Sequence, residues 1–207
     1  MFLVGIAGGS GSGKTTIAKK VLQRVAHPDV VIVHQDSYYL PSPPEHLRTT
    51  HGPNFDHPEA FDWPLLFEHL RRLREGGEIA APIYDFKTGQ RKMETLKVGP
   101  CKAVLVEGIY ALWNDHIRDL MDIRVYLHVD ADIRFIRRLH RDVRERGRSL
   151  DGIIRQYYDT VRPMHHEHLE PTQQYANLIV GEETDVAAEV LAARIKQVVE
   201  QGVERKE

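Results

Sequence analysis

The stretch that decides the fold runs from residue 8 to residue 15 and reads Gly8-Gly9-Ser10-Gly11-Ser12-Gly13-Lys14-Thr15. It matches the pattern G-x-x-x-x-G-K-S/T, in which a glycine-rich loop wraps a phosphate group. Residues 2–7 before it are an apolar run typical of a buried parallel strand, and residues 14–26 repeat apolar side chains at helical spacing. A strand, the loop and a helix in this order are the context that the motif requires. The sequence therefore predicts a loop that binds a nucleoside triphosphate, which we call the phosphate loop (residues 8–15).

The residue types of the phosphate loop fit this chemistry. Glycines let backbone N–H groups converge on phosphate oxygens, and the helix that follows adds its unpaired N–H groups and positive dipole end. Lys14 supplies a mobile positive charge for the β- and γ-phosphates, and the Thr15 hydroxyl is placed to ligate Mg²⁺. The residues expected to contact the donor nucleotide are Gly8, Gly9, Ser10, Gly11, Ser12, Gly13, Lys14, Thr15 and Thr16.

Composition and charge limit the kinds of partner. The 207 residues carry 28 basic and 30 acidic side chains, a net charge of −2, which gives no support for a broad basic surface that binds nucleic acid. No apolar run approaches the ~20 residues that span a bilayer. Cys101 is the single cysteine, so it has no intrachain disulfide partner and fits a reducing compartment. We expect a cytoplasmic protein without nucleic-acid or membrane partners.

Strands and helices alternate along most of the chain. Apolar, β-rich runs cover residues 2–7, 30–34, 103–106, 123–129 and 177–180. Helical patterns cover residues 14–26, 64–75, 115–121, 131–146, 150–169 and 185–200. This alternation predicts an α/β fold with three layers around a mainly parallel five-stranded sheet, and the phosphate loop assigns it to the P-loop NTPase class.

Two segments break the alternation within what we expect to be one domain, residues 1–207. Residues 40–63 are rich in proline, histidine and aspartate and are too long for a plain connection, so we expect a substrate loop there. Residues 79–98 indicate a β-hairpin with its turn at Thr88-Gly89. Both segments are expected at the carboxyl ends of the strands, where open α/β sheets bind ligands.

Two carboxylates follow predicted strands. Asp36 comes directly after the strand at residues 30–34, where it can orient or deprotonate an acceptor hydroxyl, join the Mg²⁺ shell, or cap a turn. Glu107 ends the run at 103–106, the place of the second carboxylate that holds Mg²⁺ in phosphate-loop enzymes. The expected metal ligands are therefore Thr15, Glu107 and Asp36.

A basic helix follows the fourth strand of the predicted sheet. Arg134, Arg138 and Arg141 fall on one stripe of it, and Arg-Gly-Arg at 146–148 marks a flexible helix end. The pattern suits a helical lid over residues 131–169 that closes cations over the transferring phosphoryl group. A solvated charged face is the alternative interpretation.

Several further strings make the chain resemble the uridine–cytidine kinase family. They are Gln35-Asp36-Ser37-Tyr38-Tyr39, Asn54-Phe55-Asp56-His57-Pro58, Pro82-Ile83-Tyr84-Asp85-Phe86, Val106-Glu107-Gly108 and Glu145-Arg146-Gly147-Arg148. The resemblance runs from residue 3 to residue 180, and these strings are much narrower than the phosphate loop, which many enzymes share. It implies that Mg²⁺ and ATP phosphorylate the 5′-hydroxyl of uridine or cytidine, in pyrimidine salvage, on an enzyme that is commonly a homotetramer.

The resemblance also implies roles for individual residues. Asp36 matches the base that faces the 5′-hydroxyl, and Asp56 matches the carboxylate that accepts hydrogen bonds from the ribose 2′- and 3′-hydroxyls. Lys14 and Arg141 complete the expected catalytic set. The other residues expected to meet the nucleoside are Tyr39, Tyr84, Phe86, Gln90, Arg138, Arg148 and Gln156.

Two departures from the family leave specificity open. A few residues after Tyr-Asp-Phe the family usually has a histidine or another hydrogen-bonding side chain, whereas this chain has Gly89 followed by Gln90. The amide of Gln90 can both donate and accept, so the preference between uridine and cytidine stays open. Residues 180–183 read Val-Gly-Glu-Glu, whereas the family commonly has a proline, an arginine and a glycine there, so ATP and GTP both stay open as donors. The alternatives for function are a phosphoribulokinase-like or nicotinamide riboside kinase-like sibling, and a switch protein that hydrolyses ATP.

Overall fold

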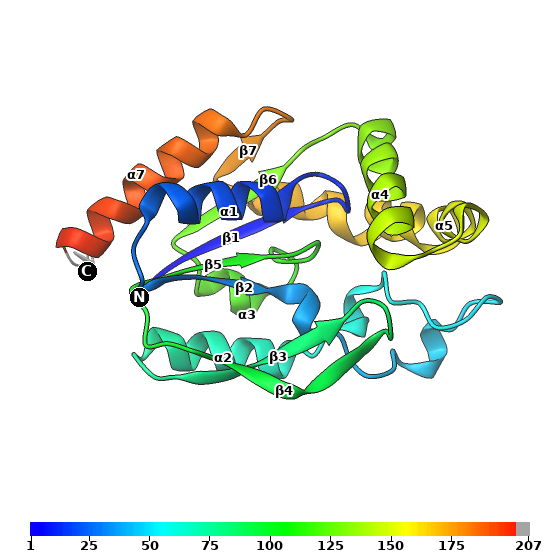
Figure 1. The fold of residues 1–207 in the computed structure, drawn as a ribbon, viewed down its shortest axis with the longest axis horizontal. Coiled ribbons are helices and arrows are strands. Elements are labelled where there is room, and N and C mark those ends of the chain that lie inside the picture. Colours follow the sequence, from blue (N-terminus) through cyan, green and yellow to red (C-terminus); the bar gives the residue numbers. More distant parts are fainter. Residues whose placement is uncertain (202–207) are drawn as a thin grey trace.

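A computed structural model describes residues 1–201 of the chain, and the end of the predicted domain, residues 202–207, lies outside the described residues. Its centre is a parallel five-stranded sheet (Figure 1). The strand order is β2 (Val30–His34), β5 (Ala103–Glu107), β1 (Phe2–Gly8), β6 (Ile123–Leu127) and β7 (Leu178–Val180). Every residue of β1 and β5 is buried, as expected for central strands covered on both faces. The predicted α/β fold with a parallel five-stranded sheet is confirmed.

Helices cover both faces of the sheet and give three layers (Figure 1). On one face lie α1 (Lys14–Val25) and α7 (Asp185–Gln201), which share a hydrophobic core with Val4 and Ile6 of β1. On the other lie α2 (Trp63–Arg74) and α3 (Asp115–Asp119), which pack in a core with Leu3. The alternation of side chains along β1 divides the two cores. No helix within residues 1–201 is both long enough and apolar enough to cross a membrane.

The two segments that break the alternation meet where the turn end of the hairpin, which runs alongside α2, reaches the loop (Figure 1). The hairpin pairs β3 (Ile79–Asp85) with β4 (Gln90–Val98) in antiparallel register, and Gly89 makes the turn with a φ of 70°. Residues 40–63 form a loop that contains two short 3₁₀ turns, Glu45–Leu47 and Pro58–Ala60. The rings of Tyr39 and Tyr84, 5.2 Å apart, connect the start of the loop to the hairpin.

The segment predicted as a lid begins with α4 (Ala131–Arg146), which ends at Gly147 with a φ of 65°. Helix α5 (Leu150–Gln156) follows, capped by the side chain of Ser149. The chain then continues through wider π turns at Tyr157–Val161 and His165–Leu169, with α6 (Arg162–Met164) between them, and a 3₁₀ segment at Glu170–Tyr175. The sequence predicted one regular helix over 150–169. Pro163 has no N–H to continue α-helical hydrogen bonding, which accounts for part of the irregularity.

Candidate active site

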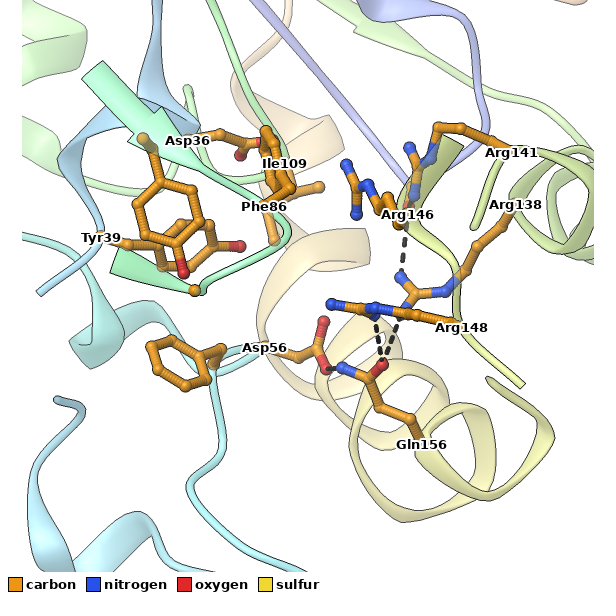
Figure 2. A pocket seen from close by; sticks show the side chains of 14 residues that line it. Asp36, Tyr39, Asp56, Phe86, Ile109, Arg138, Arg141, Arg146, Arg148 and Gln156 are labelled. Atoms are coloured by element: carbon orange, nitrogen blue, oxygen red, sulfur yellow. Dashed lines mark hydrogen bonds between the residues drawn. The ribbon is translucent and has the colours of Figure 1, made fainter. Parts of the chain in front are cut away.

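The predicted chemical groups meet at the carboxyl edge of the sheet. Glu107 is the register partner of His34 on β2 and of Ile6 on β1, so the residues that follow these strands lie together. A cavity opens at this edge, where open α/β sheets bind ligands. The side chains and backbone that line it come from Ser10, Asp36, Tyr39, Phe55, Asp56, Tyr84, Phe86, Gly89, Ile109, Arg138, Arg141, Arg146, Arg148 and Gln156 (Figure 2).

The phosphate loop has the backbone that its glycines predict. Gly11 and Gly13 have φ values of 84° and 96°. The first bond inside α1 runs from the Ile17 N–H to the Gly13 carbonyl, so the N–H groups at the start of the helix have no acceptor inside it. Lys14 is buried and its Nζ donates to the Gly9 carbonyl at 3.0 Å. Burial lowers the pKa of Lys14, and the charge of Glu107 opposes that shift. Together these groups form a cradle for a polyphosphate.

Gly11 offers a direct test of how tightly this loop is built. A Cβ at Gly11 would lie 2.3 Å from the backbone oxygen of Arg134, and the positive φ adds strain for any other residue. We expect Gly11→Ala to lower the free energy of unfolding by about 2–4 kcal/mol, measured by urea denaturation. Gly181→Ala is the control, since a Cβ there meets no atom of the described residues within 4 Å. Equal stability of the two variants would contradict the expectation.

Two oxygen ligands for a hard cation lie together at the end of the phosphate loop. The Thr15 hydroxyl donates to Glu107 Oε1 at 2.9 Å, and His34 Nδ1 lies 2.6 Å from the same oxygen. Burial on its own would raise the pKa of Glu107, but the hydrogen bond from His34 and the charge of Lys14 lower it below its usual value. Glu107 is therefore held as a carboxylate. Hydroxyl and carboxylate oxygens of this kind suit Mg²⁺.

Asp36 faces the cavity from the end of β2, close to Tyr39 (Figure 2). Burial raises the pKa of its carboxyl group and the negative charge of Glu107 raises it further, whereas Lys14, Arg146 and Arg141 act in the opposite direction. A carboxylate with a raised pKa accepts a proton more readily than an exposed aspartate does. Asp36 can therefore serve as a proton acceptor.

Arginines form the wall opposite Asp36 and Tyr39 (Figure 2). Arg138 Nη1 and Arg141 Nη2 each donate to Ser10 Oγ at 3.3 Å, which connects α4 to the phosphate loop. The guanidinium of Arg146 lies over the Phe86 ring, 3.9 Å from the ring centre. The arginine wall therefore touches both the phosphate loop and the aromatic side of the cavity.

Asp56 lines the cavity, and two residues of the segment after α4 donate hydrogen bonds to its carboxylate. Its Oδ2 accepts hydrogen bonds from Gln156 Nε2 at 2.8 Å and from the Thr160 hydroxyl at 2.7 Å. The side-chain oxygen of Gln156, Oε1, in turn accepts from Arg138 Nη2 at 2.9 Å and from Arg148 Nη1 at 3.0 Å. A continuous set of hydrogen bonds thus links Asp56 to the arginine wall.

Most of the predicted nucleoside-binding residues line this cavity, but Gln90 does not. Gln90 is exposed and pairs with Asp85, whereas Tyr84, the neighbour of Asp85, lines the cavity. Because successive side chains of a strand point to opposite faces, Gln90 shares the face that is turned away. Gly89 contributes to the wall instead. Thr16, predicted to contact the nucleotide, is exposed on the first turn of α1.

Some residues of the site were not singled out from the sequence. Phe55 and Ile109 line the cavity, and Thr160 and His34 hold Asp56 and Glu107. Thr160 lies four positions after Gln156, so helical spacing gave a signal for it. His34 precedes Gln35-Asp36 at a strand end, but its contact with Glu107 depends on the strand order β2-β5, which local sequence does not encode.

Comparisons with known proteins identify the family of the chain. The sequence model of the "Phosphoribulokinase / Uridine kinase family" matches residues 3–189. A uridine kinase from Lactobacillus helveticus (strain DPC 4571) is 48% identical over 202 residues, which cover 96% of each chain. A uridine kinase from Clostridium tetani (strain Massachusetts / E88) is 45% identical over 200 residues, again 96% of each chain. The D-glycerate 3-kinase from Cryptococcus neoformans var. grubii shares the fold, with a TM-score of 0.61, 19% identity and coverage of 87% of this chain and 86% of that one. With 187 matched positions and relatives near half identity, the chain belongs to the phosphoribulokinase / uridine kinase family.

Proposed function

We propose that the protein transfers the γ-phosphoryl group of ATP to the 5′-hydroxyl of uridine or cytidine. The observation that carries this proposal is that Asp36 and Asp56 line one cavity with Ser10 of the phosphate loop. Aromatic side chains of the same cavity, among them Tyr84 and Phe86, whose rings meet edge to face with their centres 5.2 Å apart, offer apolar surface for a base. A second ligand with hydroxyl groups and a ring therefore fits beside the polyphosphate. An ATP-hydrolysing switch needs no such second pocket.

The reaction follows from these positions. Asp36 accepts the proton of the 5′-hydroxyl while the 5′-oxygen forms a bond to the γ-phosphorus, and the bond from that phosphorus to the β–γ bridging oxygen breaks. The products are ADP and the nucleoside 5′-monophosphate. Lys14 and the backbone N–H groups hold the phosphates, and Arg138 and Arg141 face the charge on the transferring group. Little covalent chemistry is asked of the protein, so positioning and electrostatic stabilisation dominate.

We propose Mg²⁺ as the metal, held by Thr15 and Glu107 with Asp36 close by. When bound, the ion would neutralise charge on the β- and γ-phosphates. The oxygen-only donor set fits this ion better than it fits softer metals. ATP is the proposed donor, and exchanging GTP for ATP in the assay below tests that choice.

The acceptor is tested by the initial rate of ADP release with Mg-ATP and one acceptor at a time. The acceptors are uridine, cytidine, adenosine, ribulose 5-phosphate and nicotinamide riboside, with an acceptor-free control. We expect stimulation by uridine, cytidine or both. Stimulation only by ribulose 5-phosphate or by nicotinamide riboside would assign the chain to a sibling activity. Equal rates with and without acceptor would favour the ATP-driven switch.

Asp56 is expected to control binding of the nucleoside rather than of ATP. One of its oxygens is held by Gln156 and Thr160, which leaves the other to accept ribose hydroxyls. We expect Asp56→Asn to raise the KM for the nucleoside about 50-fold, because a charge-assisted acceptor is replaced by an amide, with the KM for ATP nearly unchanged. Glu59→Gln, on the exposed side of the same loop, is the matched control. A rise confined to the KM for ATP would contradict this role.

The raised pKa of Asp36 predicts the direction of the pH dependence. A proton acceptor works only when ionised, so kcat/KM for the nucleoside should be highest above the pKa of Asp36 and fall about tenfold per pH unit below it. Since burial raises that pKa from its ordinary value of 3.8, the acid limb of the pH profile should lie above 3.8. Circular dichroism at each pH verifies that the protein stays folded. A limb at or below 3.8 would contradict the assignment.

The family resemblance supports three further parts of the proposal. They are a homotetramer, a cytoplasmic location and a role in pyrimidine salvage. Light scattering of the purified protein tests the first of them, with a mass of one chain, 23.8 kDa, as the contrary result.

A further inference from the structure

One buried carboxylate lies behind the arginine wall. Asp142, on α4, has a side chain with 0% of its surface exposed, and it does not line the cavity. Its Oδ1 lies 2.8 Å from Arg141 Nη2 and 3.4 Å from Arg146 Nη1. Its Oδ2 lies 3.7 Å from Arg138 Nε and 3.4 Å from Arg148 Nη1. Each carboxylate oxygen is thus shared by two arginines, and these four arginines all line the cavity.

The backbone of Asp142 holds the same region. The N–H of Gly147, which ends α4 in a left-handed conformation, donates to the Asp142 carbonyl, and so does the N–H of Arg148 at 3.1 Å. Arg138 and Arg146 lie four positions before and after Asp142, on the same helix face. The chain turn at Gly147 brings Arg148 back to that face. Side chain and main chain of one residue therefore fix all four arginines.

Besides its ion pair with Asp142, each of these guanidinium groups contacts a residue that lines the cavity. Arg138 and Arg141 reach Ser10, Arg138 and Arg148 reach Gln156, and Arg146 covers Phe86. Four positive charges so close together repel one another, and a negative charge among them offsets that repulsion. Burial alone would raise the pKa of Asp142, but the charges of Arg141, Arg138 and Arg146 outweigh it and lower that pKa. Asp142 is therefore ionised, and the cluster keeps an excess of positive charge for an anion.

We propose that Asp142 is a positioning residue for phosphoryl transfer, which orients four arginines toward the phosphates and the nucleoside without touching either. This inference rests on the proposed kinase activity and deepens it. Two separate contributions follow from the geometry. The charge of Asp142 limits how strongly the cavity attracts anions, and the place of its carboxylate decides where the guanidinium groups point.

Two variants separate these contributions. Asp142→Asn keeps the shape and removes the charge, so we expect kcat to fall about 100-fold while the Kd for ATP, measured by calorimetry without acceptor, becomes about threefold tighter. Asp142→Glu keeps the charge but moves the carboxylate by one methylene, so we expect kcat to fall about tenfold with the Kd for ATP unchanged. Asp132→Asn, an exposed carboxylate on the same helix, is the matched control and should leave both quantities unchanged.

The folded fraction of each variant is measured by circular dichroism at the assay temperature. A folding defect lowers kcat in proportion to the folded fraction and does not tighten ATP binding, so that pattern would overturn the proposal. Wild-type kcat in Asp142→Glu would overturn it too, and this variant decides the question if Asp142→Asn is unfolded. If the wild-type protein shows no acceptor-dependent turnover, the proposed function fails, whereas the comparison of Kd values for ATP still tests the charge of Asp142.

Discussion

Replacing Asp36 by asparagine should lower kcat for nucleoside phosphorylation about 10³-fold and leave the Kd for ATP almost unchanged. Asparagine has nearly the same shape but cannot accept the proton of the 5′-hydroxyl. Burial, and then the charge of Glu107, raises the pKa of Asp36, which makes this carboxylate a better proton acceptor than an exposed aspartate. The measurements are steady-state rates with uridine or cytidine, and ATP binding by calorimetry.

The same experiment separates the two chemical roles that the sequence left open for Asp36. Loss of kcat with normal affinity for Mg-ATP identifies the proton acceptor, whereas a large loss of Mg-ATP affinity identifies a metal ligand. Asp119→Asn, at the exposed end of α3, is the matched control and should behave as wild type. A kcat within about tenfold of the wild-type value would contradict a catalytic role for Asp36.

Lys14→Met is the second substitution with a large expected effect. Methionine keeps the length and packing of the buried side chain but removes the charge that faces the β- and γ-phosphates. We expect kcat/KM for ATP to fall about 10³-fold, because an electrostatic contact that acts on the transferring group in a dry site is lost. Stability should respond differently. Burial disfavours the charged form of Lys14, so the free energy of unfolding should not fall.

The control for Lys14→Met is Lys19→Met, an exposed lysine on the same helix. This variant removes one exposed positive charge one helical turn after Thr15 and should leave kcat/KM for ATP close to the wild-type value. If both variants lowered kcat/KM equally, a general change in charge would explain the effect. If Lys14→Met instead unfolded the protein, Lys14 would be needed mainly for the loop itself, through its bond to the Gly9 carbonyl.

The periodicity of the sequence predicted the sheet and its helices well, because strands buried on both faces read as continuous apolar runs. Residues 103–106, for example, became β5, whose residues are all buried. The order β2-β5-β1-β6-β7 could not be read from local patterns, since it depends on crossovers between distant segments. Residues 150–169 were predicted as one helix, and the π turns that follow α5 depend on tertiary packing that periodicity does not reveal.

The sequence predicted the site residues well where a motif or a strand end assigns a chemical role. It predicted them less well where the orientation of the side chain determines whether the residue reaches the cavity. Lys14, Asp36 and Glu107 follow from the motif and from strand ends, and the structure brings them to one edge of the sheet. Gln90 failed to reach the cavity because hairpin register, which the sequence leaves undetermined, turns it outward. Asp142 appeared in the sequence as one acidic residue among many arginines, and its complete burial is a property of the folded helix end.

The most direct test of the proposed activity is to identify the product and the position of the new phosphate. Mass spectrometry and ³¹P NMR would follow the protein with Mg-ATP and, in separate reactions, uridine, cytidine and 5′-deoxyuridine. We predict equal amounts of ADP and nucleoside 5′-monophosphate from uridine, cytidine or both, and no phosphorylated product from 5′-deoxyuridine. ADP formed at the same rate with 5′-deoxyuridine, or a phosphate on another hydroxyl, would contradict transfer to the 5′-oxygen beside Asp36.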